Sequence, residues 1–138
     1  MTPLDDTAKS PSIASPVLWL LRLEGLAVAV LSVLLYLQLH GRVGLSWWWF
    51  AALWLVPDLS MVGYAAGPRY GAACYNAVHA YLLPALLVVA GLVSQRMSLI
   101  VIALIWFNHI GVDRLLGYGL KYSTGFGHTH LQTVKRRI

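Results

Sequence analysis

The sequence predicts an all-α integral membrane protein, a four-helix up-down-up-down bundle, and three observations lead to this fold class. Hydrophobic residues make up 59% of the 138 residues and charged residues only 11%, whereas a soluble domain carries about 25% charged residues. Four apolar stretches each reach the roughly 20 residues that a helix needs to cross a bilayer. The links between them are very short, which makes sequential helices neighbours.

The four predicted spans follow one another along a single domain. They run from Val17 to Leu39, Trp47 to Ala66, Gly71 to Val93 and Met97 to Leu120. Residues 1–15 are polar and contain prolines, so we expect a disordered N-terminal tail. Residues 16–138 then form the four-helix domain, which ends in a short basic tail.

The basic residues predict the direction in which the helices cross the membrane. Positive side chains cluster on the side of the N-terminus, where the following residues lie: Lys9, Arg69, Lys121, Lys135, Arg136 and Arg137. The opposite side holds only Arg42 and Arg96. Cytoplasmic loops carry an excess of Lys and Arg, so we expect a multi-pass protein of the bacterial inner (plasma) membrane with both termini in the cytoplasm.

The same distribution predicts which partners the protein has. The basic residues do not form a stripe on a soluble domain, so we expect no nucleic-acid partner. The basic C-terminal end is suited to a lipid bilayer with anionic headgroups. Small residues such as Gly63 and Gly67 also permit a homodimer through close helix contact.

Ionisable side chains inside the predicted spans are the main functional signal. A charge at the bilayer centre costs about 2.5–3.5 kcal/mol on insertion scales, so such a residue indicates a functional site. Three of the five acids, Glu24, Asp58 and Asp113, fall within spans, together with His79 and His109. With a rise of about 1.5 Å per residue, these three acids and two histidines all lie in the cytoplasmic half of their helices. His109 and Asp113 are four residues apart and therefore share one helix face.

These residue types predict a metal site. Neutral imidazole and carboxylate groups are good ligands for zinc, iron or manganese, and the metal ligands that we expect are His79, His109, Asp113 and His130. A divalent ion would activate a water molecule, with Asp58 or Glu24 as general base. We expect substrate to contact Asn76, Tyr64, Tyr118, Arg114 and His128. The function predicted is hydrolysis of a lipid-like or amphipathic substrate at the cytoplasmic leaflet.

Three other interpretations of the same residues stay open at the level of sequence. His79 and His109 lie at similar depth, as the axial ligands of a b-type haem do. Buried acids and histidines also mark proton or small-solute transport, or a binding module without chemistry. Finally, paired buried groups can fix the register of helices and have no chemical role.

Two strings of the sequence carry a family resemblance. YNAVHAYLLP and WFNHIGVDRLLGYGLKY, with the later FGHTHL, resemble a bacterial membrane family known as domain of unknown function 4260. The resemblance implies a compact four-helix membrane domain in which these His, Asp and Tyr positions are family features, and it implies no activity. A more distant similarity is to small bacterial membrane proteins described as metal-dependent hydrolases.

Overall fold

The computed structural model describes residues 15–131, and these form helices joined by short turns. The elements in order are α1 (Ser15–Val43), α2 (Trp47–Trp54), the 3-10 helix η1 (Val56–Ala66), α3 (Pro68–Val78), α4 (Leu82–Val93) and α5 (Met97–Leu116). Within the described part there is no strand, only one isolated bridge between Lys121 and Thr129. The predicted N-terminal tail, apart from Ser15, and the basic residues beyond 131 lie outside the described residues.

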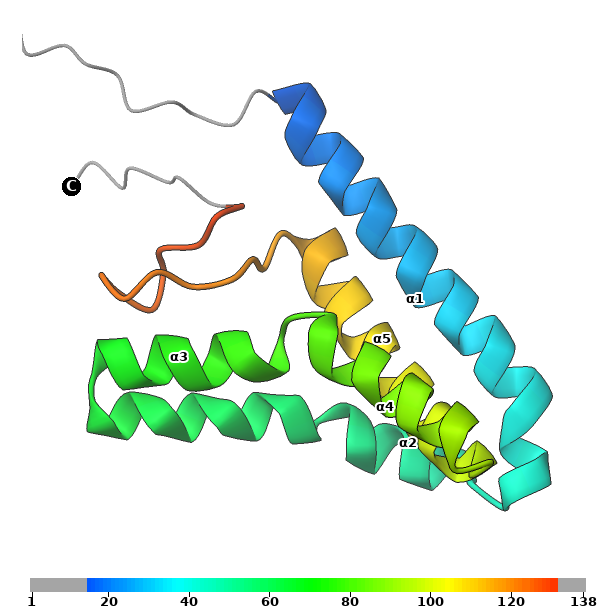
Figure 1. The fold of residues 1–138 in the computed structure, drawn as a ribbon. Coiled ribbons are helices and arrows are strands. Elements are labelled where there is room, and N and C mark those ends of the chain that lie inside the picture. Colours follow the sequence, from blue (N-terminus) through cyan, green and yellow to red (C-terminus); the bar gives the residue numbers. More distant parts are fainter. Residues whose placement is uncertain (1–14, 132–138) are drawn as a thin grey trace, which may run out of the picture.

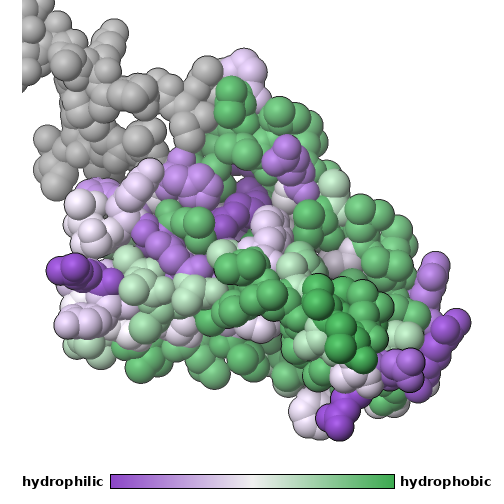
Figure 2. Space-filling model, in the orientation of Figure 1, coloured by the Kyte–Doolittle hydropathy of each residue, from purple (hydrophilic) through white to green (hydrophobic). Residues whose placement is uncertain are grey.

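Four helical stretches are long and apolar enough to cross a membrane: Pro16–Val43, Trp47–Ala66, Pro68–Val93 and Met97–Leu116. Most of their apolar surface faces outward, and only 6% of the most apolar window of the second stretch is buried. Figure 2 shows the same pattern as a broad hydrophobic surface with hydrophilic residues at its two ends. Soluble monomers rarely expose so much continuous apolar surface, so the all-α membrane class is confirmed. The up-down-up-down order of the spans stays a prediction.

The second predicted helix changes its type in the middle. Pro57 has no N–H and cannot donate to the carbonyl of Leu53, as an α-helix would require. The N–H of Asp58 instead donates to the carbonyl of Leu55 at 3.2 Å, a 3-10 bond. A 3-10 run of 11 residues is unusual, because such runs seldom exceed 3–4 residues and often mark a functional hinge.

The third predicted helix is interrupted, which the sequence did not predict. α3 ends at Val78 and α4 begins at Leu82. Pro84 lacks the N–H that would bond the carbonyl of Ala80, so a continuous helix would lose a hydrogen bond here. Figure 1 shows the consequence: η1 and α3 form a hairpin whose axis points in a different direction from α4 and α5.

The fourth predicted helix ends four residues earlier than expected, so the boundary at Leu120 is wrong. Gly117 adopts a left-handed conformation with φ 90°. The N–H of Gly117 donates to the carbonyl of Arg114, and the N–H of Tyr118 donates to that of Asp113. These two bonds make a Schellman motif, which stops the helix. The chain then turns back over the hairpin as residues 117–131 (Figure 1).

The contact between α1 and α5 is the most extensive helix pair of the described fold and depends on two glycines. A methyl group on Gly111 would lie 2.8 Å from the backbone nitrogen of Ala29 and 2.9 Å from the carbonyl oxygen of Gly25. Asn108 adds a hydrogen bond of 2.8 Å from its side-chain amide to the carbonyl of Ala29. Small residues therefore let the two backbones touch.

We predict that Gly111→Ala lowers the free energy of unfolding by about 1–3 kcal/mol, the usual cost of overpacking. Gly41→Ala is the matched control, because a methyl group there meets nothing within 4 Å. It should be neutral or slightly stabilising, since alanine favours a helix over glycine. Thermal unfolding of both variants in detergent, followed by tryptophan fluorescence, compares them. Equal shifts in the two variants would contradict the proposed close contact.

Candidate metal centre

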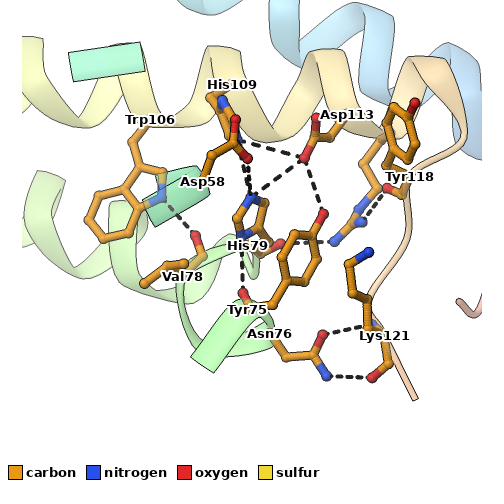
Figure 3. Close-up of polar contacts among 11 residues, drawn as sticks. Asp58, Tyr75, Asn76, Val78, His79, Trp106, His109, Asp113, Tyr118 and Lys121 are labelled. Atoms are coloured by element: carbon orange, nitrogen blue, oxygen red, sulfur yellow. Dashed lines mark hydrogen bonds and ion pairs between the residues drawn. The ribbon is translucent and has the colours of Figure 1, made fainter. Parts of the chain in front are cut away.

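Four ionisable side chains meet where the η1–α3 hairpin diverges from α5. Asp58 comes from η1, His79 follows the last residue of α3, and His109 and Asp113 lie one turn apart on α5. Figure 3 shows them pointing toward one another. Both breaks in the spans lie beside this cluster, because Pro57 precedes Asp58 and the interruption of the third span begins at His79.

The functional atoms of the cluster are closely spaced. The Nε2 atoms of His79 and His109 are 3.1 Å apart. Asp58 Oδ1 lies 3.5 Å from each of these nitrogens, and Asp113 Oδ2 lies 3.6 and 3.7 Å from them. Asp58, His79 and His109 each offer one ligand atom within 4.8 Å of the others. Both histidines are almost fully buried.

The surroundings fix the orientation of each imidazole. His79 Nδ1 lies 3.0 Å from the carbonyl of Tyr75, so this nitrogen carries a proton and donates it. The lone pair of His79 Nε2 therefore points into the cluster. The Tyr75 ring stacks on His79 with centroids 3.7 Å apart, and the Trp54 ring meets His109 edge-to-face at 4.6 Å. Metal-binding histidines almost always donate their second ring nitrogen to a carbonyl, carboxylate or water, as His79 does to the carbonyl of Tyr75.

The cluster brings together more hydrogen-bond acceptors than donors. A carboxylate is an acceptor only, and a neutral imidazole that donates through Nδ1 accepts through Nε2. His109 Nδ1 is buried and has no hydrogen-bond partner among the described residues. Two carboxylates and the lone pair of His79 Nε2 thus converge. The one N–H that can lie among them is that of His109 Nε2. A cation or extra protons must balance this arrangement.

The spacing suits a divalent ion. Metal–ligand bonds of about 2.0–2.1 Å in a tetrahedron hold neighbouring ligand atoms about 3.4 Å apart. The measured separations between each carboxylate oxygen and the two nitrogens, 3.5 to 3.7 Å, and the 3.1 Å between the nitrogens lie around this value. The residues present therefore fit a zinc-like ion with little movement.

Two side chains of α5 satisfy the carbonyls that the break in the third span leaves free. Arg114 donates from Nη2 to the carbonyl of His79 at 2.9 Å and from Nη1 to that of Tyr118 at 2.7 Å. Trp106 donates from its indole nitrogen to the carbonyl of Val78 at 2.7 Å. Buried carbonyls need such partners, so these bonds hold His79 in place.

A cavity of about 300 Å³ opens beside the cluster. It is lined by Asp58, Met61, Tyr75, Asp113, Tyr118, Lys121 and Phe126. The hydroxyl of Tyr75 donates to Asp113 Oδ2 at 3.3 Å. Lys121 is buried, and burial lowers the pKa of its ammonium, while the charge of Asp113 opposes this shift. The cavity thus exposes both carboxylates of the cluster to a ligand.

Residues 117–131 close one side of this cavity through paired backbone contacts. The side-chain amide of Asn76 donates to the carbonyl of Lys121 at 2.8 Å, and its oxygen accepts from the Lys121 N–H at 2.7 Å. His130 Nδ1 accepts from the N–H of Leu120 at 2.8 Å. Both side chains therefore shape the backbone of the segment.

The structure brings together some of the predicted site residues and separates others. Asp58, His79, His109 and Asp113 form the cluster, and Tyr118 lines its cavity. Asn76 and Arg114 hold the adjoining backbone. The remaining predicted residues, Glu24, His130, His128 and Tyr64, do not join the cluster.

Each of these four has another environment. Glu24 and His130 line a second cavity of about 350 Å³ beside Arg114. His128 contacts Thr124. Tyr64 packs against Gly71 and Phe126, which leaves its buried hydroxyl without a hydrogen-bond partner among the described residues.

Three residues of the site had no predicted role. Tyr75 precedes His79 by one turn, and this spacing was a usable signal. Trp54 also has a usable signal, because it lies one helical turn before Asp58 and its indole donates to Asn108 at 3.1 Å. Lys121 had no signal, because only the fold of residues 117–131 turns it into the cavity.

A family model described as "Domain of unknown function (DUF4260)" matches residues 19–134. The chain belongs to this family. Comparison with curated proteins and with solved structures gives no significant match. Family membership is therefore confirmed, and the chemistry rests on the geometry of the site.

We predict that acid loosens residues 117–131 through His130. Burial, reinforced by the positive charge of Arg114, lowers the pKa of His130 below its ordinary value of 6.5. The folded state then binds fewer protons than the unfolded state, so the stability of the segment falls as the pH drops through 6.5. Hydrogen exchange at the amides of Leu120 and His130, corrected for intrinsic rates, should be faster at acid pH.

The control for this prediction is His130→Asn, whose side-chain oxygen can replace Nδ1 as the acceptor from Leu120. This variant should keep the segment closed at both pH values. Equal acid sensitivity in the variant and the wild type would exclude His130 as the cause.

Proposed function

We propose that the protein is a membrane-embedded, metal-dependent hydrolase acting on an amphipathic substrate at the cytoplasmic leaflet. One observation carries the proposal: two buried imidazole nitrogens 3.1 Å apart face two carboxylates, with one N–H at most among these four groups. A divalent ion balances these charges at the spacing that the side chains already have.

The geometry favours Asp58, His79 and His109 as the ligands, since these three form the tightest group of ligand atoms. Two histidines and one carboxylate form the ligand set of several catalytic zinc sites, which leave a position open. A divalent ion held there would act as a Lewis acid and lower the pKa of a water molecule toward 7.

Asp113 is the proton acceptor in this proposal. Its carboxylate lines the cavity and lies within 4 Å of both histidine nitrogens, while the Tyr75 hydroxyl orients it. Asp113 and Asp58 therefore exchange the roles that the sequence suggested. Glu24 is not the base here, because it lines a different cavity.

The lining of a neighbouring groove supports an amphipathic substrate. An apolar groove of about 360 Å³ is lined by Leu53, Val56, Pro57, Ser60, Val78, Ile102 and Trp106. Pro57 and Val78 directly precede Asp58 and His79 in the sequence, so the groove adjoins the cluster. A substrate with an apolar chain and a polar group can use both spaces at once.

A haem fits this geometry less well than an ion does. Two imidazoles on opposite sides of an iron, each with a metal–nitrogen bond of about 2 Å, would stand about 4 Å apart. The 3.1 Å separation of the nitrogens and the carboxylates beside them leave little room for a porphyrin between the rings.

The first test of the proposal is metal content. We expect the purified full-length protein, dialysed against zinc, manganese or iron(II), to hold close to one ion per chain by elemental analysis. His79→Gln, His109→Gln and Asp58→Asn should each lose affinity by more than the roughly 10–100-fold typical of outer partners. Glu24→Gln and His128→Gln are matched controls from outside the cluster and should bind like the wild type. A wild type without a stoichiometric ion under all three conditions would refute the site.

The second test separates metal binding from catalysis. Asp113→Asn should keep the ion but lower kcat about 10²–10⁴-fold, the usual contribution of a general base. Metal-loaded protein incubated with a panel of lipid esters and amides, with products followed by mass spectrometry, supplies the assay. Loss of the ion in Asp113→Asn would assign this residue to the ligands, and full activity would exclude it as the base.

A further inference from the structure

Among the described residues, Lys121 is the one cationic side chain lining the cavity beside the cluster. Its side chain is buried, with 8% of the residue exposed. The ammonium donates to the carbonyl of Phe126 at 3.1 Å and lies 3.5 Å from the centroid of the Phe126 ring and 4.7 Å from that of Tyr75. Figure 3 shows the ammonium beside the Tyr75 ring, across that ring from His79.

This ammonium lacks an anionic partner within the described part of the chain. The ion pairs there within 4.0 Å all join Asp58 or Asp113 to the two histidines. A lysine has three donors, and this ammonium makes one hydrogen bond to the residues that the structure describes. Buried charges are normally paired, so a ligand in the cavity is the natural source of the missing negative charge.

The charge of the cavity depends on the metal ion. Asp58 and Asp113 together carry two negative charges, which the positive charges of Lys121 and of Arg114, bonded to the carbonyl of His79, just balance. A divalent ion at the cluster adds two positive charges and leaves the site with an excess of positive charge. An anion is therefore bound more tightly after the metal has bound.

We infer that the cavity binds an oxyanion, the phosphate or carboxylate group of the substrate, between the metal cluster and the ammonium of Lys121. The inference rests on the proposed function and narrows its substrate class to anionic amphiphiles. Charge-assisted hydrogen bonds from an ammonium to such oxygens are roughly twice as strong as neutral ones. Lys121 is then a residue that determines specificity, held in position by Asn76 through its backbone.

The competing explanation is that Lys121 only fastens residues 117–131 through its bond to Phe126. In that case its charge would have no effect on ligands, and its removal would loosen the segment. The two explanations differ in whether the bound metal changes the affinity for an anion.

The experiment measures binding of inorganic phosphate by calorimetry to the full-length protein in detergent, with and without zinc. Zinc-loaded wild type should bind phosphate at least about tenfold more tightly than the metal-free protein. Lys121→Gln should lose this gain and keep its zinc, whereas Lys121→Arg should retain most of the gain. Arg69→Gln removes an exposed cation from the first turn of α3 and is the matched control.

Elemental analysis of the same samples separates the two proposals. A wild type without zinc would refute the metal site itself. Stoichiometric zinc with unchanged phosphate affinity in Lys121→Gln would overturn the anion site alone. Equal phosphate affinity of the wild type with and without zinc would also overturn it, and this comparison does not depend on the folding of any variant.

A competition experiment identifies the source of the oxyanion. The competitors are an alkyl phosphate in zwitterionic vesicles and free phosphate. Stronger displacement of the bound phosphate by the alkyl phosphate supports an amphipathic ligand. Weaker displacement by the alkyl phosphate would overturn the amphipathic assignment in favour of a soluble anion.

Discussion

The crowding of acceptor atoms around two buried imidazoles is the constraint on which the rest of this structure depends. The Nε2 atoms of His79 and His109 lie 3.1 Å apart. Asp58 and Asp113 each place a carboxylate oxygen within 4 Å of both nitrogens. One N–H can bridge the two nitrogens, but the remaining lone pairs at such distances repel one another unless a cation or further protons lie between them. The fold around the cluster serves to hold these groups in place against that repulsion.

Three elements reach the cluster only because two membrane-length stretches are broken. The 3-10 helix η1 presents Asp58, and the interruption after α3 places His79 at a turn rather than inside a helix. Broken helices expose backbone groups, which a membrane tolerates only where protein or water satisfies them. Arg114 and Trp106 supply these bonds from α5. The buried guanidinium of Arg114 thus holds the backbone in place by donating to carbonyl oxygens.

The helix α1 supports the site from a distance. Its contact with α5 brings the carbonyl of Ala29 to Asn108, whose side-chain oxygen accepts from Trp54, and Trp54 in turn packs against His109. This chain of contacts explains why a polar side chain, Asn108, is buried next to the two glycines of the α1–α5 contact. At the opposite end of the described fold, Tyr36, Val101 and Ile105 pack together, and the Tyr36 hydroxyl donates to the carbonyls of Leu45 and Ser46.

The sequence by itself determined the membrane class, the existence of four spans and the residues of the cluster. Composition and apolar length are sufficient for the first two, because a bilayer demands them of any helix that crosses it. The cost of burying charge singled out Asp58, His79, His109 and Asp113, and the i, i+4 spacing paired the last two. Only the tertiary structure decided that Glu24 and His130 belong to a second cavity, since depth in a bilayer does not fix direction around a helix axis. It also decided the breaks in the spans and the inward position of Lys121, because these depend on hydrogen bonds between residues distant in the chain, such as Asn76 with Lys121 and Arg114 with His79.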